Sequence, residues 1–138
     1  MIKVLLAEDH AVVRDALCYL LEAQGDIQIT ATAADGREAV EKAMQQCPDV
    51  AVMDISMPRM DGIEATREIC AFCPKTRVVM LTIYHTPEHI RRALQAGATG
   101  YVLKDAAGQE LVAAIRTLYE GGRYFSSNTS NSGENYAA

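Results

Sequence analysis

The fold is decided by residues 50–62, which read Val-Ala-Val-Met-Asp-Ile-Ser-Met-Pro-Arg-Met-Asp-Gly. Val50–Met53 is a short continuous apolar run, typical of a strand buried on both faces of a parallel sheet. The run ends at Asp54, and the Pro and Gly content of residues 56–62 is that of a loop. Asp61 is a good N-cap for a following helix. The stretch predicts one strand–loop–helix unit.

The same unit repeats on both sides of this stretch. Besides 50–53, strands are expected over 3–7, 27–33, 77–82 and 101–104, each followed by an apolar pattern with helical spacing. Asp105 is expected to cap the last helix. The stripe expected to face inward on the first helix is Val12, Val13, Ala16, Leu17, Leu20 and Leu21. Five strand–helix units predict an α/β fold, with a parallel sheet covered by helices on both faces.

Length and charge restrict the function classes. The 138 residues fit one domain, and 13 basic against 18 acidic residues give a formal net charge of −5. An acidic domain gains no counterion-release free energy from nucleic acid, so unaided DNA binding is not expected. The longest uncharged apolar run, 78–84, is far shorter than the roughly 20 residues of a membrane-spanning helix. We therefore expect no membrane partner.

The N-terminus and the cysteines point to the cytoplasm. The first apolar run stops at Glu8, which is too early for the hydrophobic region of a secretory signal peptide. Without an export signal a cytoplasmic location is expected, and disulfides are rare there. The four cysteines are therefore expected to be reduced thiols, namely Cys18, Cys47, Cys70 and Cys73.

Polar residues stand where the strands end. Glu8 and Asp9 follow the first strand, Asp54 ends the third, Thr82 the fourth and Lys104 the fifth. In an open parallel sheet the carboxyl ends of the strands form the ligand site, so these side chains should meet. Clustered carboxylates repel one another, so their pKa values rise unless a cation neutralises them, and oxygen ligands with few carboxylates suit Mg²⁺. Asp54 is then placed to act as a nucleophile toward phosphorus, with Lys104 neutralising charge on the phosphoryl group.

These residues, together with Met57-Pro58, resemble the receiver domain of two-component response regulators. The stretches 7–10, 54–62, 97–105 and 114–126 are similar to the NarL/FixJ-type subgroup with LuxR-type output. The resemblance implies a flavodoxin-like (βα)5 doubly wound parallel sheet with strand order 2-1-3-4-5. It predicts a receiver domain over 1–122 and a flexible tail or linker remnant over 123–138.

The resemblance also implies a role for each residue. Asp54 is the expected phosphoacceptor, and Mg²⁺ or Mn²⁺ is held by Glu8, Asp9, Asp54 and the backbone carbonyl of Ser56. Lys104 and Thr82 complete the catalytic set, and Thr82 with Tyr101 forms the conformational switch. The expected phosphodonor is a phosphohistidine on a sensor histidine kinase, and a homodimer is a further expected assembly. Such a domain is not an enzyme beyond its own phosphorylation and dephosphorylation.

Two departures from the family pattern affect the functional prediction. The residue after the switch threonine is usually small, but here it is Ile83, so we expect slowed phosphorylation, dephosphorylation or both. Subgroup members usually continue into a DNA-binding helix-turn-helix domain, and the 13 residues after Phe125 cannot form one. We expect the receiver part of a transcription regulator that reaches DNA only through a missing C-terminal domain. The alternative is a stand-alone receiver, or a pseudo-receiver that acts by protein–protein interaction.

Other function classes fit less well. The pair Cys70 and Cys73 closes a helix, whereas a catalytic Cys-x-x-Cys normally opens one, and a zinc site would need two more ligands. A haloacid-dehalogenase-type phosphatase wants a second Asp where Ser56 stands, and the chain has no P-loop motif. His10 follows the acidic pair, so it either approaches the metal or simply begins the first helix in an exposed position.

Overall fold

The structure, a computed structural model, describes residues 1–126. Strands and helices alternate along the chain, as the sequence predicts. The elements are β1 (Ile2–Ala7), α1 (Ala11–Glu22), β2 (Ile27–Ala33), α2 (Gly36–Gln45), β3 (Val50–Asp54), α3 (Gly62–Phe72), β4 (Arg77–Thr82), α4 (Pro87–Ala96), β5 (Gly100–Leu103), a 3-10 turn (Lys104–Ala106), α5 (Ala107–Tyr119) and β6 (Tyr124–Phe125).

All strands belong to one parallel sheet with the order β2-β1-β3-β4-β5-β6. The order 2-1-3-4-5 implied by the resemblance is confirmed, and a short sixth strand is added beyond β5. Because β1 lies between β2 and β3 and the chain moves outward from it in both directions, the strand order reverses beside β1 and β3. The carboxyl ends of these strands form the crevice in which such sheets bind ligands.

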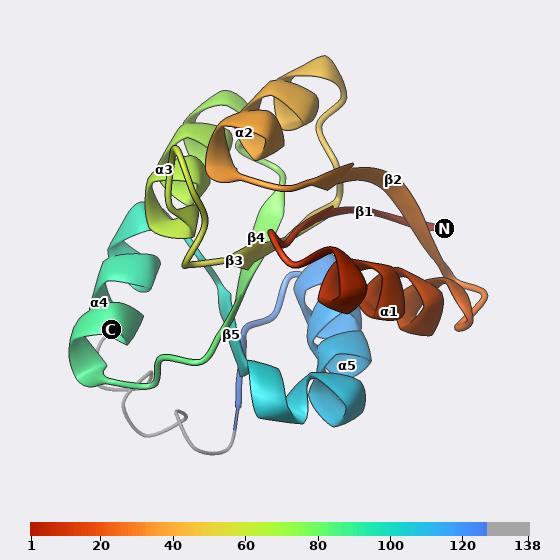
Figure 1. Cartoon of the computed structure of the whole chain (residues 1–138). Coiled ribbons are helices and arrows are strands. Elements are labelled where there is room, and N and C mark those ends of the chain that lie inside the picture. Colours follow the sequence, from red (N-terminus) through yellow and green to blue (C-terminus); the bar gives the residue numbers. More distant parts are fainter. Residues whose placement is uncertain (127–138) are drawn as a thin grey trace.

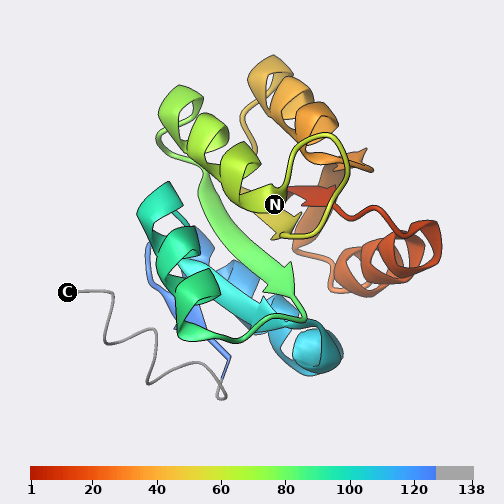
Figure 2. The ribbon, with the colours of Figure 1, turned by 60° about the vertical axis from the view of Figure 1, so that its left-hand side comes forward.

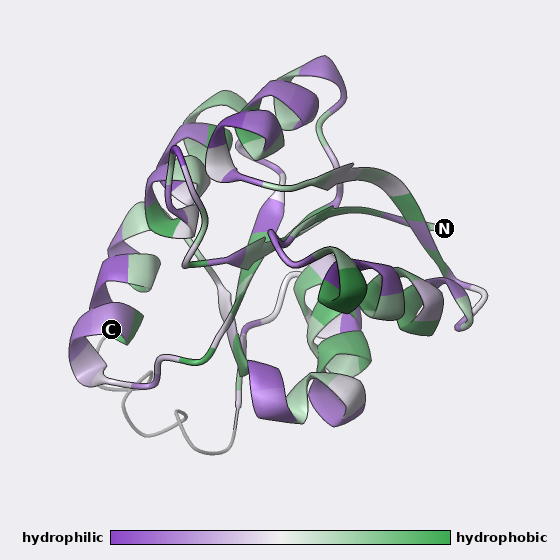
Figure 3. Cartoon of the chain, viewed as in Figure 1, coloured by the Kyte–Doolittle hydropathy of each residue, from purple (hydrophilic) through white to green (hydrophobic). Residues whose placement is uncertain are grey.

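The helices form two layers, one on each face of the sheet (Figure 1). Helices α2, α3 and α4 cover one face and α1 and α5 the other, and a view turned by 60° shows the same division (Figure 2). Each helix layer covers a separate apolar core, because successive strand residues point to opposite faces of the sheet. Leu5, Met53 and Met80 pack toward α2–α4, whereas Val4, Val52 and Val79 pack toward α1 and α5. The strands are accordingly coloured mainly as hydrophobic in Figure 3.

The helix starts follow the sequence signals except at α5. Asp35, Asp61 and Thr86 each accept a hydrogen bond from the backbone N–H three residues later, so they are true N-caps. The predicted cap at Asp105 is wrong. Strand β5 ends at Leu103, and the chain turns directly into the 3-10 turn that contains Asp105. Helix α5 therefore begins two residues later, without a side-chain cap.

The inward stripe expected on α1 is only partly correct. Leu17 and Leu21 are buried, but Val12 is 83% exposed and Val13 and Ala16 are also exposed. The helix is apolar on two sides, and only the side that carries Leu17 and Leu21 faces the sheet and α5. Periodicity alone cannot show which of two apolar sides the fold covers.

The end of the receiver fold lies further along the chain than predicted. A flexible tail was expected from residue 123, yet Tyr124–Phe125 pairs with β5. Ser126 is buried, its backbone N–H donates to the Tyr101 carbonyl, and its hydroxyl accepts from the Leu103 N–H. The expected tail therefore does not hold for residues 124–126. The rest of it, 127–138, lies outside the described residues.

The expectation of four reduced cysteines is wrong for two of them. Cys47 and Cys73 form a disulfide, while Cys18 and Cys70 are free thiols. The packing of α2 against α3 brings the Cα atoms of Cys47 and Cys73 to 5.8 Å, within the range that a disulfide bridges. Among the described residues, no helix is long and apolar enough to cross a membrane.

Candidate functional site

The parallel register brings the polar strand ends to one edge of the sheet. Ala7 pairs with Met53, Asp54 with Leu81 and Thr82 with Leu103. The residues at or just after these positions are Glu8, Asp9, Asp54, Thr82 and Lys104, which are the residues expected to form the site. The convergence at one edge is therefore a consequence of strand pairing.

Lys104 bridges two buried carboxylates. Its Nζ lies 2.8 Å from Glu8 Oε1 and 2.9 Å from Asp54 Oδ2. Glu8 is fully buried and Asp54 is 2% exposed. Buried carboxylates are costly unless they are paired, so the ammonium group is what allows two of them to stand side by side.

Asp9 and His10 complete the acidic side of the site. His10 is the N-cap residue of α1, and its Nδ1 lies 3.0 Å from Glu8 Oε2 and 3.2 Å from Asp9 Oδ1. The His10 side chain is 69% exposed, so the expectation that it begins the first helix in an exposed position is confirmed. Its ring also contacts the acidic cluster, while its approach to a metal stays a prediction.

The donor set fits a divalent cation. Ligand atoms of Glu8, Asp9, His10 and Asp54 all lie within 4.8 Å of one another. Asp9 Oδ1 is buried, and apart from the 3.2 Å contact with His10 Nδ1 it has no hydrogen-bond partner within residues 1–126. A buried carboxylate oxygen with so few partners is the kind of atom that a metal ion satisfies, and a mainly oxygen donor set suits Mg²⁺. Receiver domains bind Mg²⁺ generally.

Burial and pairing move the pKa values of the two carboxyls in opposite directions. Burial by itself raises the pKa of Glu8, but hydrogen bonds from Lys104 and His10 outweigh it and lower the pKa to about 2. At Asp54 burial is the larger effect, and with repulsion from Glu8 it raises the pKa to about 6 despite the bond from Lys104. Of the two carboxyls, Asp54 is therefore the one whose ionised form the site stabilises less. A nearby cation or a covalent modification would neutralise this unfavourable charge.

Thr82 and Tyr101 are both buried beside the site. The Thr82 hydroxyl accepts a 3.1 Å hydrogen bond from the Tyr84 N–H, and Tyr101 Oη donates a 2.6 Å bond to the Tyr84 carbonyl. The Tyr84 ring stacks on His89 with centroids 4.4 Å apart. The loop between β4 and α4 is therefore fastened through Tyr84 to both residues of the predicted switch.

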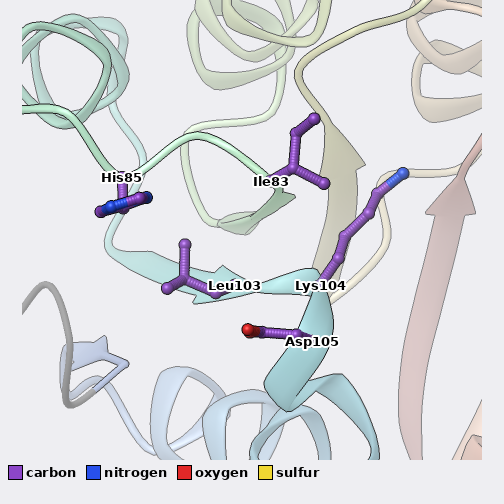
Figure 4. Close-up of a pocket in the computed structure, with 5 residues that line it drawn as sticks. All are labelled: Ile83, His85, Leu103, Lys104 and Asp105. Atoms are coloured by element: carbon purple, nitrogen blue, oxygen red, sulfur yellow. The ribbon is translucent and has the colours of Figure 1, made fainter.

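Ser56 and Ile83 stand at the mouth of the site. The Ser56 N–H donates to Asp54 Oδ1 at 3.2 Å, and its hydroxyl lies 3.3 Å from Tyr84 Oη. Ile83 is 67% exposed and lines an open pocket of about 440 Å³. Figure 4 shows the Ile83 and Lys104 side chains together at this pocket, with the Asp105 carboxyl pointing another way.

The loop after Asp54 is held by contacts that sequence reasoning missed. Arg59, with a left-handed φ of 65°, forms an ion pair with the buried Asp35. A Cβ added at Gly62 would lie 2.0 Å from the Asp54 carbonyl oxygen, so only glycine fits there. The Asp-Gly pair at 61–62 is a sequence pattern from which the close approach of Gly62 to Asp54 could have been predicted. The Asp35–Arg59 ion pair joins residues far apart in sequence, and no local sequence pattern predicts it.

Comparison with known proteins agrees with this geometry. Residues 4–116 match the response regulator receiver domain family. The oxygen regulatory protein NreC of Staphylococcus haemolyticus is 44% identical over 123 residues, which cover 88% of this chain. The chain spans 57% of the length of that relative.

Solved structures agree with the family match. A LuxR-family two-component response regulator from Aurantimonas superimposes with a TM-score of 0.92 at 32% identity, covering 98% of this chain and 96% of that one. A LuxR-family DNA-binding response regulator from Staphylococcus aureus gives 0.81 at 29% identity, covering 86% of this chain and 99% of that one. The chain therefore belongs to the response regulator receiver domain family, and it is similar to NreC and to LuxR-family two-component response regulators.

Proposed function

We propose that Asp54 is the phosphoacceptor and takes a phosphoryl group from the phosphohistidine of a sensor histidine kinase. The observation that carries this assignment is the bridge that Lys104 makes between Asp54 and Glu8 at the carboxyl edge of the sheet. Asp54 is the carboxylate that contacts both Lys104 and the Ser56 N–H, and its ligand atom lies within 4.8 Å of those of Glu8, Asp9 and His10.

Each neighbour has a part in the reaction. An Asp54 oxygen attacks phosphorus, the bond from phosphorus to the histidine nitrogen breaks, and the nitrogen leaves as neutral imidazole once it carries a proton. Lys104 and the Ser56 N–H lie beside the Asp54 oxygens, where they would stabilise the negative oxygens of the incoming group. Glu8, Asp9, Asp54 and the Ser56 backbone carbonyl would hold Mg²⁺ or Mn²⁺, which supplies further charge neutralisation when bound.

Thr82 and Tyr101 would carry the signal away from Asp54. For the Thr82 hydroxyl to donate to the phosphoryl group, it must leave its present contact with the Tyr84 N–H. Tyr101 already lies inward and holds the Tyr84 carbonyl, so the loop that contains Tyr84 couples the two side chains. The expected output surface is α4, β5 and α5, which follow this loop along the chain.

We infer the biological role from the family, and it is part of the same proposal. The domain would act in the cytoplasm, pair with a sensor histidine kinase and assemble as a homodimer. Its output would be transcription regulation, with DNA contacted only through a helix-turn-helix domain beyond the receiver. The predicted receiver domain covers 1–122, with a linker after it. The boundary between the two would move to residue 126, so that the domain includes β6. The domain would catalyse only its own phosphorylation and dephosphorylation.

The experiment is direct phosphorylation by a small donor. Incubation of the full chain with acetyl phosphate and Mg²⁺ should add the mass of one phosphoryl group, as seen by intact mass spectrometry. Asp54→Asn should remove the addition, while Asp61→Asn, which changes an exposed acid and keeps a capping side chain, should retain it. A wild type that stays unmodified would instead favour a pseudo-receiver that acts by protein–protein interaction.

A further inference from the structure

We propose that the Cys47–Cys73 disulfide is a reversible redox-modification site that exchanges with small thiols of the glutathione class. The bond lies just before β3 and β4, at the edge of the sheet opposite to Asp54. Phosphoryl transfer makes no use of it. Disulfides in the cytoplasm are usually transient and redox-sensing, so the inference rests on the cytoplasmic setting proposed above.

The two cysteine segments are held together without the disulfide. The Thr76 hydroxyl donates a 2.6 Å hydrogen bond to the Pro48 carbonyl, and the Arg77 N–H donates a 3.0 Å bond to the Asp49 carbonyl. The Asp49 N–H in turn donates to the Lys3 carbonyl of β1. These backbone contacts keep the segments side by side when the sulfur–sulfur bond opens, so the bond can form again in place.

The surroundings also accept the reduced form. Cys73 is 2% exposed, and its Sγ lies 3.5 Å from the Ala43 carbonyl oxygen. A thiol at this position can donate to that carbonyl, so reduction leaves no buried group without a partner. Cys47 is exposed, and its thiol would be solvated by water.

An incoming thiol can reach the bond. Both cysteines line an open pocket of about 390 Å³, whose walls include Pro48, Phe72 and Pro74. Because Cys47 is the exposed partner, an external thiolate attacks Cys47 Sγ, and Cys73 leaves as a thiolate that takes up a proton. A second small thiol then resolves the mixed disulfide on Cys47. Overall one protein disulfide and two small thiols give two protein thiols and one small disulfide, a two-electron reduction.

Cys70 does not belong to the redox pair. It lies one turn before Cys73 on α3, and its Sγ faces Gly97 at the end of α4, where an added Cβ would come within 2.8 Å of the sulfur. The pair Cys47 and Cys73 instead closes a loop of the chain that contains β3 and α3. Oxidation therefore restricts the unfolded chain and raises the stability of the segment that carries Asp54.

The test equilibrates the full chain with oxidised glutathione or with dithiothreitol and then alkylates it with iodoacetamide in denaturant, so that buried thiols also react. Intact mass should show two alkyl groups after oxidation and four after reduction, and peptide mapping should find Cys47 joined to Cys73. The melting temperature should fall by several degrees on reduction, with an unchanged far-UV circular dichroism spectrum, and reoxidation should restore it. Cys47→Ser should melt like the reduced wild type in both buffers, whereas Cys70→Ser should keep the full response.

The proposal would be overturned by the absence of a disulfide after oxidation, by a Cys70–Cys73 pair in its place, or by loss of the folded spectrum on reduction. A redox-dependent melting temperature that persists in Cys47→Ser would do the same. Phosphorylation of Asp54 by acetyl phosphate is measured separately, and we expect equal labelling in both redox states. The thiol exchange can be measured whether or not the chain takes up a phosphoryl group, so the two proposals can fail independently.

Discussion

Tyr101 Oη donates a 2.6 Å hydrogen bond to the Tyr84 carbonyl oxygen, so a buried residue of β5 fixes the loop that follows β4. Tyr84 is held a second time, because its N–H donates to the Thr82 hydroxyl at the end of β4. Any movement of the Thr82 hydroxyl toward Asp54 must therefore release one of the contacts that fasten this loop.

The first prediction is that Tyr101→Phe loosens the loop without unfolding the domain. The ring still fills its buried position, but the Tyr84 carbonyl loses its donor, which costs about 1 kcal/mol of unfolding free energy. Hydrogen exchange measured by mass spectrometry should speed up in residues 83–86. Tyr119→Phe, which changes a half-exposed tyrosine on α5, is the control and should leave both quantities unchanged. Unaltered exchange in Tyr101→Phe would show that the bond does not restrain the loop.

The second prediction concerns Lys104. Lys104→Met leaves Glu8 and Asp54 buried beside each other without a cation, so the unfolding free energy should fall by about 3 kcal/mol at neutral pH without Mg²⁺. Urea unfolding followed by circular dichroism measures this loss. Lys75→Met removes an exposed lysine, and its effect should stay within about 0.5 kcal/mol. Equal stability of the two variants would mean that the bridge contributes nothing.

Asp54→Asn should make the metal-free domain more stable at pH 7. Burial and the Glu8 charge raise the pKa of Asp54 from 3.8 to about 6, so ionisation of this carboxyl opposes folding. A raised pKa gives stability that is complete below pH 3.8 and is lost as the pH rises through about 6. The gain from Asp54→Asn should therefore be on the order of 2 kcal/mol at pH 7 and shrink toward zero near pH 4.

Urea unfolding at pH 4, 5, 6 and 7 measures this difference. Asp15→Asn, on the exposed side of α1, serves as the matched control and should show no such pH dependence relative to wild type. A gain that is constant across the pH range would exclude ionisation of Asp54 as its cause.

The sequence predicts the candidate functional site better than it predicts the helix contacts and the last strand of the fold. The polar strand ends were visible because each stands directly after an apolar run, and strand pairing then requires that they meet. The contact of Cys47 with Cys73 depends on how α2 packs against α3, and no local pattern reports such a contact. Helix α1 is apolar on two sides, so its buried face is decided by the fold alone. Strand β6, with two residues, exists only because β5 offers an edge.

We expect Mg²⁺ to bind the folded cluster and therefore to raise the melting temperature of the wild type by mass action. Asp9 Oδ1 is buried within the acidic cluster, with only His10 Nδ1 beside it, so Asp9→Asn should remove most of this stabilisation. Thermal unfolding in a Mg²⁺ series, with excess chelator as the zero point, measures the effect. Asp61→Asn, at an exposed helix cap, should respond to Mg²⁺ like the wild type. A full Mg²⁺ response in Asp9→Asn would place the ion elsewhere.

The last prediction concerns Ile83, which stands at the mouth of the pocket beside Lys104 (Figure 4). We predict that its branched side chain narrows the approach of a phosphodonor or an attacking water to Asp54. Ile83→Ala should therefore increase both acetyl-phosphate labelling and aspartyl-phosphate hydrolysis several-fold, measured by intact mass over time. Because Ile83 is 67% exposed, its truncation should cost little stability, which separates access from folding. Val12→Ala trims an exposed apolar side chain on α1 and should leave both rates unchanged. Equal rates in Ile83→Ala and wild type would show that this side chain does not limit access to Asp54.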